Sequence, residues 1–328
     1  MDLSILIVNW NTRDPLRECL RSVRDTAAGV SHEVFVVDNA SSDGSSGMVR
    51  EEFPEFGLIA SRKNLGFARG NNLAYRRSSG RHVLVLNPDA VLLPGTLQGL
   101  VEFADRHPDA GFTSPGLLNP DRTPQRKYYG RIPTLSTVFF LHTGPGRLLD
   151  ARLFGHRFRR RDRYEDLGDF HGPVAFTDGG AGFCCTLVPR RVIEEVGFFD
   201  ERFPVFFNDG DFAARLFHAG YRAYVLPHVQ ALHRGGASVQ RLDSLAYRKE
   251  FTYGLRAYFR KHRGRRQAAA VDCLLGLNAL AELGRAAGKI LAGKKAVSEI
   301  LTPVREFRET ISYRPANAAA AERGGEPS

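Results

Sequence analysis

The sequence predicts an α/β fold: a mostly parallel, Rossmann-like sheet covered by helices on both faces, with a helical extension at the C-terminal end. In residues 1–115, short apolar runs alternate with amphipathic helical segments, which is the pattern of βαβ units. Acidic and amide residues follow several of these runs, at the sheet edge where α/β proteins bind ligands. With 328 residues, 43% of them hydrophobic and 25% charged, the chain can bury a sizeable core.

The N-terminal elements follow one another at short intervals. Residues 3–8 (LSILIV) are an apolar run typical of a buried strand. Asp14-Pro15 opens the first helix, because proline is well tolerated in a first helical turn. Further strands are expected at residues 33–38, 58–61, 83–86 and 111–114, separated by helices at residues 48–53, 66–77 and 94–107.

The second half of the chain is less regular. Residues 120–175 are rich in Arg, Gly, Pro and aromatic residues and predict a long, partly irregular excursion, with short helices around residues 134–142 and 147–154. Regular structure is expected again at residues 179–188, with helices at 190–196 and 211–219 and a strand at 221–226. Two longer helices follow at residues 245–260 and 268–291.

Cysteine usage and the N-terminus both indicate a cytoplasmic protein. Cys19 and Cys273 stand alone, Cys184 and Cys185 are adjacent, and no CxxC spacing indicates a zinc site. We therefore expect reduced, buried thiols. The first residues show no basic segment followed by a cleavage site, and no run of 18 apolar residues occurs, so neither a signal peptide nor a transmembrane helix is expected.

Positive charge is concentrated near the C-terminus. The chain carries a net charge of +10, and residues 241–328 contain 17 Lys and Arg against 9 Asp and Glu. Eight basic residues lie within residues 248–266, next to the apolar helix expected at 268–291. Such a pair of segments is typical of a helix on an anionic membrane surface, and equally of a helix packed on the protein with a solvated basic face. No nucleic-acid-binding motif accompanies the charge.

Two polar segments follow strands of the expected sheet. Asp38-Asn39 ends one strand, and Asn87-Pro88-Asp89 follows another. Because the carboxyl ends of parallel strands meet at one sheet edge, we expect the two segments to lie close together. Asp38 can accept hydrogen bonds from a base or ribose, and Asp89 can bind a divalent cation that holds a diphosphate. Each segment alone is also an ordinary turn or helix cap.

Two later positions carry titratable groups. Asp209 and Asp211 follow an aromatic run, and a carboxylate in apolar surroundings has a raised pKa that suits a general base. The same residues also suit the first turn of a helix. His233 follows the strand at 221–226 and can share a cation with Asp89, although a lone histidine is more often structural.

Taken together, these segments resemble the family 2 glycosyltransferases of the GT-A fold, and most of all their rhamnosyltransferase-like branch. The similar segments run in the family's order between residues 3 and 238. They are ILIVNWN at 5–11, VVDNASSDG at 36–44, NLGFARGNN at 64–72, VLVLNPDA at 83–90, GFFDERFPVFFNDGD at 197–211 and ALHRGGAS at 231–238.

The resemblance implies a role for individual residues. Asp38 would hold the nucleotide base or ribose, while Asp89 and His233 would bind Mg²⁺ or Mn²⁺. Asp209 would be the catalytic base, with Asp211 as the alternative base, and Gly180 and Ala181 would line the acceptor side together with Asp209. The nucleotide-sugar site would comprise Asn9, Asn11, Asp38, Asn39, Asn64, Gly66, Arg69, Asn72, Asn87 and Asp89.

Two departures from the family pattern concern the metal and the base. Asn87 stands where many relatives carry Asp, which leaves Asp89 as the only carboxylate of the Asp-x-Asp metal motif. Asn208 stands where an acidic residue often precedes the base. A catalytically weak or inactive nucleotide-sugar-binding or scaffold protein of the same fold is therefore the alternative to an active enzyme. A dinucleotide-dependent dehydrogenase is disfavoured, because no GxGxxG follows the first strand.

The resemblance also implies the organisation and the partners. We expect a GT-A catalytic domain at residues 1–240, with its nucleotide-sugar half at 1–115 and its acceptor half at 116–240. A basic helical region at 241–314 and a disordered tail at 315–328 would follow. The expected reaction is inverting transfer, with dTDP-L-rhamnose as donor and a glycan or lipid-linked acceptor of cell-surface polysaccharide biosynthesis. The expected location is the cytoplasm, at the inner face of the cell membrane, with no nucleic-acid partner; the oligomeric state is open and includes a homodimer.

Overall fold

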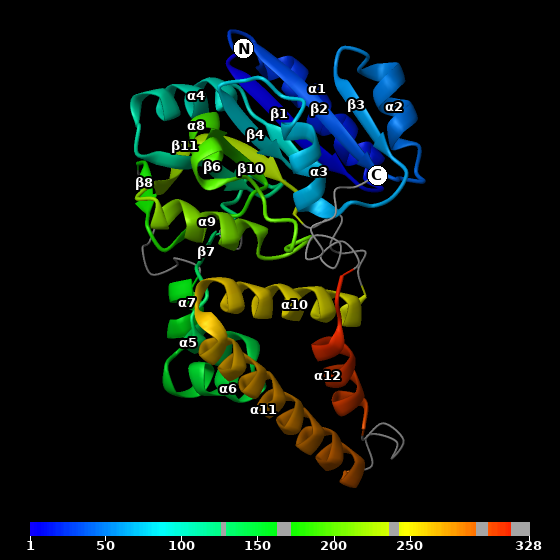
Figure 1. Cartoon of the computed structure of the whole chain (residues 1–328), viewed down its shortest axis with the longest axis vertical. Helices are drawn as coiled ribbons and strands as arrows, with labels where there is room; N and C mark the ends of the chain where they lie inside the picture. The colour runs from blue at the N-terminus through cyan, green and yellow to red at the C-terminus, as the bar shows by residue number, and fades with distance from the viewer. Residues whose placement is uncertain (126–128, 163–171, 236–242, 293–300, 316–328) are drawn as a thin grey trace.

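The computed structural model describes residues 1–125, 129–162, 172–235, 243–292 and 301–315. Figure 1 shows a sheet with helices on both faces and, beneath it, a separate layer of helices. The main sheet has nine strands in the order β3-β2-β1-β4-β10-β6-β11-β5, with β8 paired to β11. The expected disordered tail from residue 316 onward lies outside the described residues.

The first half of the sheet is parallel and matches the expected βαβ pattern. Its strands are β1 (Leu3–Asn9), β2 (His32–Asn39), β3 (Gly57–Ser61) and β4 (His82–Leu86), and the helices between them are α1 (Arg13–Thr26), α2 (Ser45–Glu52) and α3 (Gly66–Tyr75). Asn9 and Asp38 are paired at the carboxyl ends of β1 and β2. β4, on the other side of β1, also ends at this edge.

The second half of the sheet is mixed, because one antiparallel strand is inserted between β4 and β6. The elements are β5 (Ala90–Leu92), α4 (Thr96–Arg106), β6 (Ala110–Leu118), β8 (Val174–Phe176), β10 (Cys185–Pro189), α8 (Arg190–Val196), α9 (Asn208–His218) and β11 (Arg222–His233). β10 is antiparallel to both β4 and β6. β11 extends seven residues beyond the strand expected at 221–226, and its last part pairs with β5.

The irregular middle segment and the C-terminal part build the lower layer in Figure 1. The middle segment contributes α5 (Leu135–His142), α6 (Gly144–Leu153) and α7 (Arg157–Asp162) to this layer. Its strand β7 (Tyr129–Arg131) pairs with β9 (Gly179–Ala181), which follows the segment, in a small two-stranded sheet. The C-terminal part contributes α10 (Ser244–His262), α11 (Gly264–Leu291) and α12 (Thr302–Ser312). The short helices expected around 134–142 and 147–154 are present, whereas α7, α12, β5, β7 and β8 were not expected. None of the described helices is long and apolar enough to cross a bilayer.

Three apolar clusters hold these layers together. One cluster packs α1, α2 and α4 against one face of the sheet, through residues such as Leu16, Met48 and Leu100. The second packs α3, α8 and α9 against the opposite face, with Phe212 among its members. The third joins α5, α10 and α11 to the chain before α9, where Phe203 is buried. The structure is therefore a sheet with two covered faces and a C-terminal helical extension.

A buried carboxylate ties α9 to α10. Asp211 is fully buried, and its oxygens lie 2.5 Å from Lys261 Nζ, 2.8 Å from His262 Nε2 and 3.0 Å from Arg215 Nε. Lys261 also contacts Asp200, at 2.6 Å. Removing one partner of such a buried group typically costs about 3–5 kcal/mol, because the remaining charges are left uncompensated. The position of α9 over α10 therefore depends on Asp211.

Substitution of Phe212 by Ala tests the core beneath α9. The Phe212 ring is completely buried and packs against Phe183, Phe198 and Phe199. We expect Phe212→Ala to lower the free energy of unfolding by about 3–5 kcal/mol, because it removes apolar contacts and leaves a cavity. Urea denaturation provides the measurement. Phe154→Ala is the control, since that ring is 43% exposed, and a loss for Phe212→Ala no larger than for this control would contradict the packing.

Candidate active site

Asp38 lies at the carboxyl end of β2 within a network of short polar side chains. Asn9 Nδ2 donates to Asp38 Oδ1 at 2.9 Å, and Ser46 Oγ donates to Asp38 Oδ2 at 2.6 Å. The Asn9 amide is itself oriented by Thr12, whose hydroxyl donates to Asn9 Oδ1. The side chains of Asn9 and Asp38 are thus held in one orientation at the sheet edge, which is the preorganisation that a binding site requires.

The segment Asn87-Pro88-Asp89 lies at the same edge and meets His233. Strand register explains this contact, because β11 pairs antiparallel with β5 and sets His233 opposite Ala90, the neighbour of Asp89. His233 Nε2 lies 3.3 Å from Asp89 Oδ1 and 3.5 Å from Asn87 Nδ2. His233 is completely buried and Asp89 is 4% exposed.

The Asp89–His233 pair is suited to a cation. Gln125 Oε1 lies 2.9 Å from His233 Nδ1 and accepts its N–H, which turns Nε2 toward Asp89. Burial lowers the pKa of His233, but Cys184 and Asp89 outweigh it and raise the pKa to about 10. Without a metal, His233 therefore carries a proton on the Nε2 that faces Asp89, and a divalent cation bound there would displace this proton, because an imidazole ligand must be neutral. An imidazole nitrogen with a carboxylate oxygen is a common ligand set for divalent metals. The described residues contain no cluster of three or more His, Cys, Asp or Glu that could hold a metal ion.

The residues expected over the nucleotide are engaged with neighbouring loops. Asn39 accepts the Leu65 N–H and donates to Gly66 O, while Asn64 Oδ1 accepts the Gly66 N–H. Asn72 is hydrogen-bonded to Phe199 through both its amide nitrogen and its oxygen. These amides fix the start of α3 against β2 and against the chain before α9.

Asn11 and Arg69 flank the same edge. Asn11 has a left-handed backbone (φ 54°), and its side-chain oxygen accepts the Ser42 N–H at 2.7 Å. Asn11 therefore closes the turn after Asp38. Arg69 Nε lies 3.8 Å from Glu201.

Asp209 faces a different part of the site, a cavity of about 360 Å³ that we call the Asp209 cavity. Gly180 and Ala181 of β9 line it, together with Phe207, Arg131 and the chain around them. Phe207 has a left-handed backbone (φ 66°) at the start of α9, and this bend places Asp209 in the first helical turn. The cavity adjoins the sheet edge, because Gly182 lines it and Cys184, two residues later, accepts the Asn87 N–H at 2.8 Å.

Asp209 and Asp211 differ in their surroundings although they share one helical turn. Burial raises the pKa of Asp209 and outweighs the hydrogen bonds that its carboxylate accepts from backbone groups, among them Gly210 N–H at 2.8 Å. Burial also raises the pKa of Asp211, but the hydrogen bond from His262 and the charges of Arg215 and Lys261 outweigh it and lower the pKa overall. Asp209 therefore has the protonation behaviour of a base facing a cavity, whereas Asp211 is committed to ion pairs.

Two residues of the site were not singled out from the sequence. Gln125 is 2% exposed and contacts both the ring and the backbone of His233. Its Oε1 accepts from the ring, and its Nε2 donates to His233 O at 2.6 Å. Arg131 lines the Asp209 cavity and forms an ion pair with Asp178. Both lie in or near the irregular middle segment, where no periodicity or motif distinguishes one polar residue from another.

Comparisons with known proteins identify the family of this chain. A sequence model of glycosyl transferase family 2 matches residues 4–176, more than half of the chain. The N-acetylglucosaminyl-diphospho-decaprenol L-rhamnosyltransferase of Mycobacterium tuberculosis is 28% identical over 235 residues, covering 67% of this chain and 73% of that protein. The low-salt glycan biosynthesis hexosyltransferase Agl10 of Haloferax volcanii is 25% identical over 249 residues, covering 74% of this chain and 70% of that protein.

The fold is also that of solved glycosyltransferases. The mannosyltransferase PcManGT from Pyrobaculum calidifontis, solved with GDP-Man and Mn²⁺, superposes with a TM-score of 0.54 at 20% identity, covering 99% of this chain and 88% of that one. The expected GT-A fold is thereby confirmed, and so is the rhamnosyltransferase-like resemblance. With more than half of its length matched by the family model, the chain belongs to glycosyl transferase family 2.

Proposed function

We propose that this protein is an inverting glycosyltransferase that moves a sugar from a nucleoside diphosphate to a hydroxyl of a glycan or lipid-linked acceptor. The observation that carries the proposal is the Asp209 cavity, where a carboxylate of raised pKa adjoins the sheet edge bearing Asp38 and Asp89. A carboxylate of this kind is suited to removing a proton from an acceptor hydroxyl. Cell-surface polysaccharide biosynthesis is the proposed setting.

The proposed reaction is a single displacement. The acceptor hydroxyl gives its proton to Asp209, and its oxygen attacks the anomeric carbon from the face opposite the diphosphate. The bond between the anomeric carbon and the diphosphate oxygen breaks, and the nucleoside diphosphate leaves. Asp38 holds the base or ribose, with Asn9 and Ser46 keeping its carboxylate in place. Gly180 and Ala181 leave room for the acceptor at the cavity wall.

Asp89 and His233 are the residues that would hold Mg²⁺ or Mn²⁺. A bound divalent cation supplies positive charge that stabilises the diphosphate leaving group. Two protein ligands suit a metal that also takes oxygen ligands from phosphates and water. Gln125 keeps the His233 ring oriented for this role. The Mn²⁺ complex of the Pyrobaculum mannosyltransferase supports the use of a divalent metal.

The donor proposed is dTDP-L-rhamnose, and the acceptor carries a lipid diphosphate. The sugar and the acceptor follow the name of the Mycobacterium relative, which describes transfer of L-rhamnose to N-acetylglucosaminyl-diphospho-decaprenol. The dTDP nucleotide follows from the resemblance to the rhamnosyltransferase-like branch. The alternative is an inactive nucleotide-sugar-binding scaffold. Asn87 favours it, because the metal motif has one carboxylate. Nucleotide-sugar binding without turnover would distinguish that scaffold from an enzyme.

The lower helical layer is the proposed contact with the membrane at the inner face of the cell membrane. Apart from Met1, the exposed large apolar residues of the described chain belong to this layer. Leu148 and Leu153 of α6 are 50% and 69% exposed, and Leu280 of α11 is 62% exposed. Exposed arginines belong to the same layer, at positions 147 and 152 of α6 and 157, 159, 160 and 161 of α7. Exposed leucines beside arginines suit an anionic lipid surface.

Asp209→Asn tests the base. We expect kcat to fall about 10²–10⁴-fold, because the amide cannot accept the acceptor's proton. The free energy of unfolding should be unchanged or higher, since a desolvated carboxylate is removed. Because the base acts only when deprotonated and burial raises its pKa, the wild-type rate should rise with pH across the raised pKa of Asp209. Single-turnover transfer across a pH series provides the measurement.

Asp211→Asn is the matched variant on the same helical turn. It should lower the free energy of unfolding by ~3–5 kcal/mol, since Arg215, Lys261 and His262 lose their shared partner. The folded variant should keep most of its transfer activity. Loss of turnover in folded Asp211→Asn, with activity retained in Asp209→Asn, would reverse the assignment of the base.

Asp89→Asn and His233→Ala test the metal ligands. Each should weaken Mn²⁺ binding in the presence of a nucleoside diphosphate by at least about tenfold, and Gln125→Ala should weaken it about 10–100-fold by releasing the His233 ring. Electron paramagnetic resonance titration of Mn²⁺ gives the affinity without turnover. Asp178→Asn is the control, because this exposed carboxylate pairs with Arg131 and contacts neither Asp89 nor His233 in the described structure. Equal Mn²⁺ affinity in all variants would refute the proposed ligands.

Vesicle binding tests the membrane contact. We expect co-sedimentation with phosphatidylglycerol vesicles that weakens as salt rises, because salt screens exposed charges within about 10 Å at 0.1 M. Leu148→Ser combined with Leu153→Ser should weaken binding at least about tenfold, through loss of apolar burial. Phosphatidylcholine vesicles serve as the uncharged control. Binding that is indifferent to lipid charge and to these leucines would contradict the proposal.

A further inference from the structure

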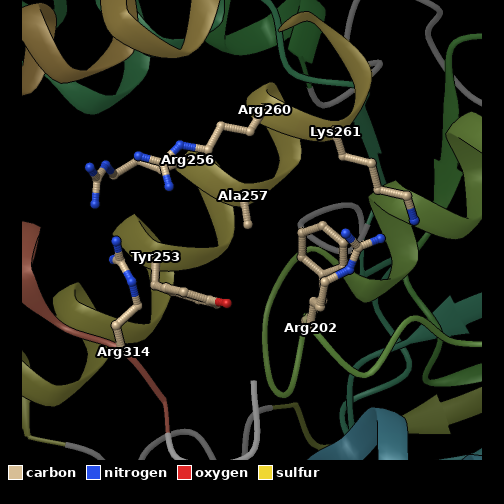
Figure 2. Close-up of a pocket in the computed structure, with 8 residues that line it drawn as sticks. Arg202, Tyr253, Arg256, Ala257, Arg260, Lys261 and Arg314 are labelled. Carbon is tan, nitrogen blue, oxygen red and sulfur yellow. The ribbon is translucent and has the colours of Figure 1, made fainter. Parts of the chain in front are cut away.

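A second pocket lies against α10 and is lined mainly by cationic side chains (Figure 2). Its volume is about 190 Å³. We call it the arginine pocket. Figure 2 shows Arg256, Arg260 and Lys261 extending from α10, Arg202 facing them from the loop before α9, and Arg314 entering from the segment after α12. The lining residues are Arg202, Phe203, Tyr253, Arg256, Ala257, Arg260, Lys261 and Arg314.

Three of the five cations are held in place by carboxylates. Arg256 is 8% exposed and contacts Asp272 at 2.5 Å, which anchors it between α10 and α11. Lys261 bridges Asp200 and Asp211, at 2.6 and 2.5 Å. Arg202 also pairs with Asp200, at 2.7 Å. These ion pairs fix one side of the pocket. Their carboxylates are Asp200, Asp211 and Asp272.

The other two cations add uncompensated charge. Neither Arg260 nor Arg314 contacts a carboxylate anywhere in the described ranges, and both are exposed at the pocket. Arg314 has one hydrogen bond in the described structure, to the neighbouring Tyr313 O. Like charges gathered around one hollow repel one another, so the pocket creates a positive potential that attracts an anion. Arginine offers several N–H donors in a fixed plane and binds phosphate oxygens in pairs.

The size of the arginine pocket favours a small anionic group over a large anionic ligand. Pockets for drug-sized ligands usually measure about 300–1,000 Å³, so 190 Å³ suits a small group rather than a whole nucleotide. Tyr253 adds a hydroxyl, and Figure 2 shows it directed into the space between α10 and Arg202. A phosphate or diphosphate group matches this combination of size, charge and donors.

We propose that the arginine pocket binds the diphosphate group of a lipid-linked acceptor. This inference rests on the proposed transferase function. The pocket is joined to the first turn of α9, because its lining residue Lys261 pairs with Asp211, and the same turn carries Asp209. An acceptor held there by its diphosphate places its lipid beside the helical layer and leaves its sugar to reach the Asp209 cavity.

The donor diphosphate is the other source of the same chemistry. It belongs at the sheet edge with Asp89 and His233, and neither residue lines the arginine pocket. The two sites also differ in their means of binding. At the sheet edge, a diphosphate would be bound through a cation that Asp89 and His233 hold. In the arginine pocket, guanidinium groups would contact the diphosphate oxygens themselves. Binding in the presence of a chelator therefore separates them.

Calorimetric titration with inorganic pyrophosphate and with geranyl diphosphate tests the pocket, using the full chain at low salt with EDTA. We expect both probes to bind the wild type. Arg260→Gln combined with Arg314→Gln should weaken both at least about tenfold, since each arginine makes charged hydrogen bonds. Arg265→Gln combined with Arg266→Gln is the matched control, because these exposed arginines lie outside the pocket, and its affinities should stay within about twofold of the wild type.

Two further measurements separate the acceptor from the donor. In the Arg260/Arg314 double variant, the KM for a prenyl-diphosphate-linked acceptor should rise while the affinity for dTDP with Mn²⁺ stays unchanged. An equal loss of dTDP affinity would assign the pocket to the donor and overturn the proposal. So would unchanged pyrophosphate affinity in the double variant, or no binding by the wild type. Because the titrations need no turnover, a protein that binds pyrophosphate through these arginines but transfers no sugar would refute the transferase function alone.

Discussion

The buried carboxylate of Asp211 is the interaction on which the junction between the sheet domain and the lower helical layer depends. Without its contacts to Lys261 and His262, the sheet domain and the lower helical layer would share mainly apolar packing around Phe203. The ion pairs hold the first turn of α9 against α10, and Asp209 lies in that same turn. Gly254 of α10 contributes to the same junction, because a Cβ at that position would lie 2.7 Å from the Phe207 ring. The strained backbone of Phe207 is therefore supported by close packing from α10.

The sheet edge is assembled by strand register over long sequence separations. β1 and β2 bring Asn9 beside Asp38, and the extended end of β11 brings His233 beside Asp89. Gln125 then reaches His233 from the middle segment. The segment that appeared irregular in the sequence thus supplies an orienting contact at the proposed metal site and one wall of the Asp209 cavity, through Arg131. Its irregularity agrees with the general finding that loops carry functional residues on a rigid scaffold.

Much of the fold could be predicted, and the omissions have physical causes. β1, β2, β3 and β4 were predicted to within about one residue, because buried parallel strands are continuous apolar runs. β5, β7 and β8 are three residues long, which is too short for a periodic signal. α9 begins at Asn208 instead of Asp211, since the left-handed Phe207 starts the helix and is an unusual conformation for that residue. The helices α10 and α11 were predicted, but the sequence did not show that they pack against α5 and against the chain around Phe203.

The sequence by itself determined the alternation of elements, the family and the set of polar residues at the sheet edge, because apolar periodicity and short motifs are local properties. Only the tertiary structure distinguished Asp209 from Asp211. Two acidic residues in one helical turn look alike in sequence, and their protonation depends on cations that approach from α10, about 50 residues further on. The same holds for the basic C-terminal region. Whether a lysine or arginine is neutralised or lines an open pocket depends on which carboxylates the fold places within reach, and sequence spacing does not specify that distance.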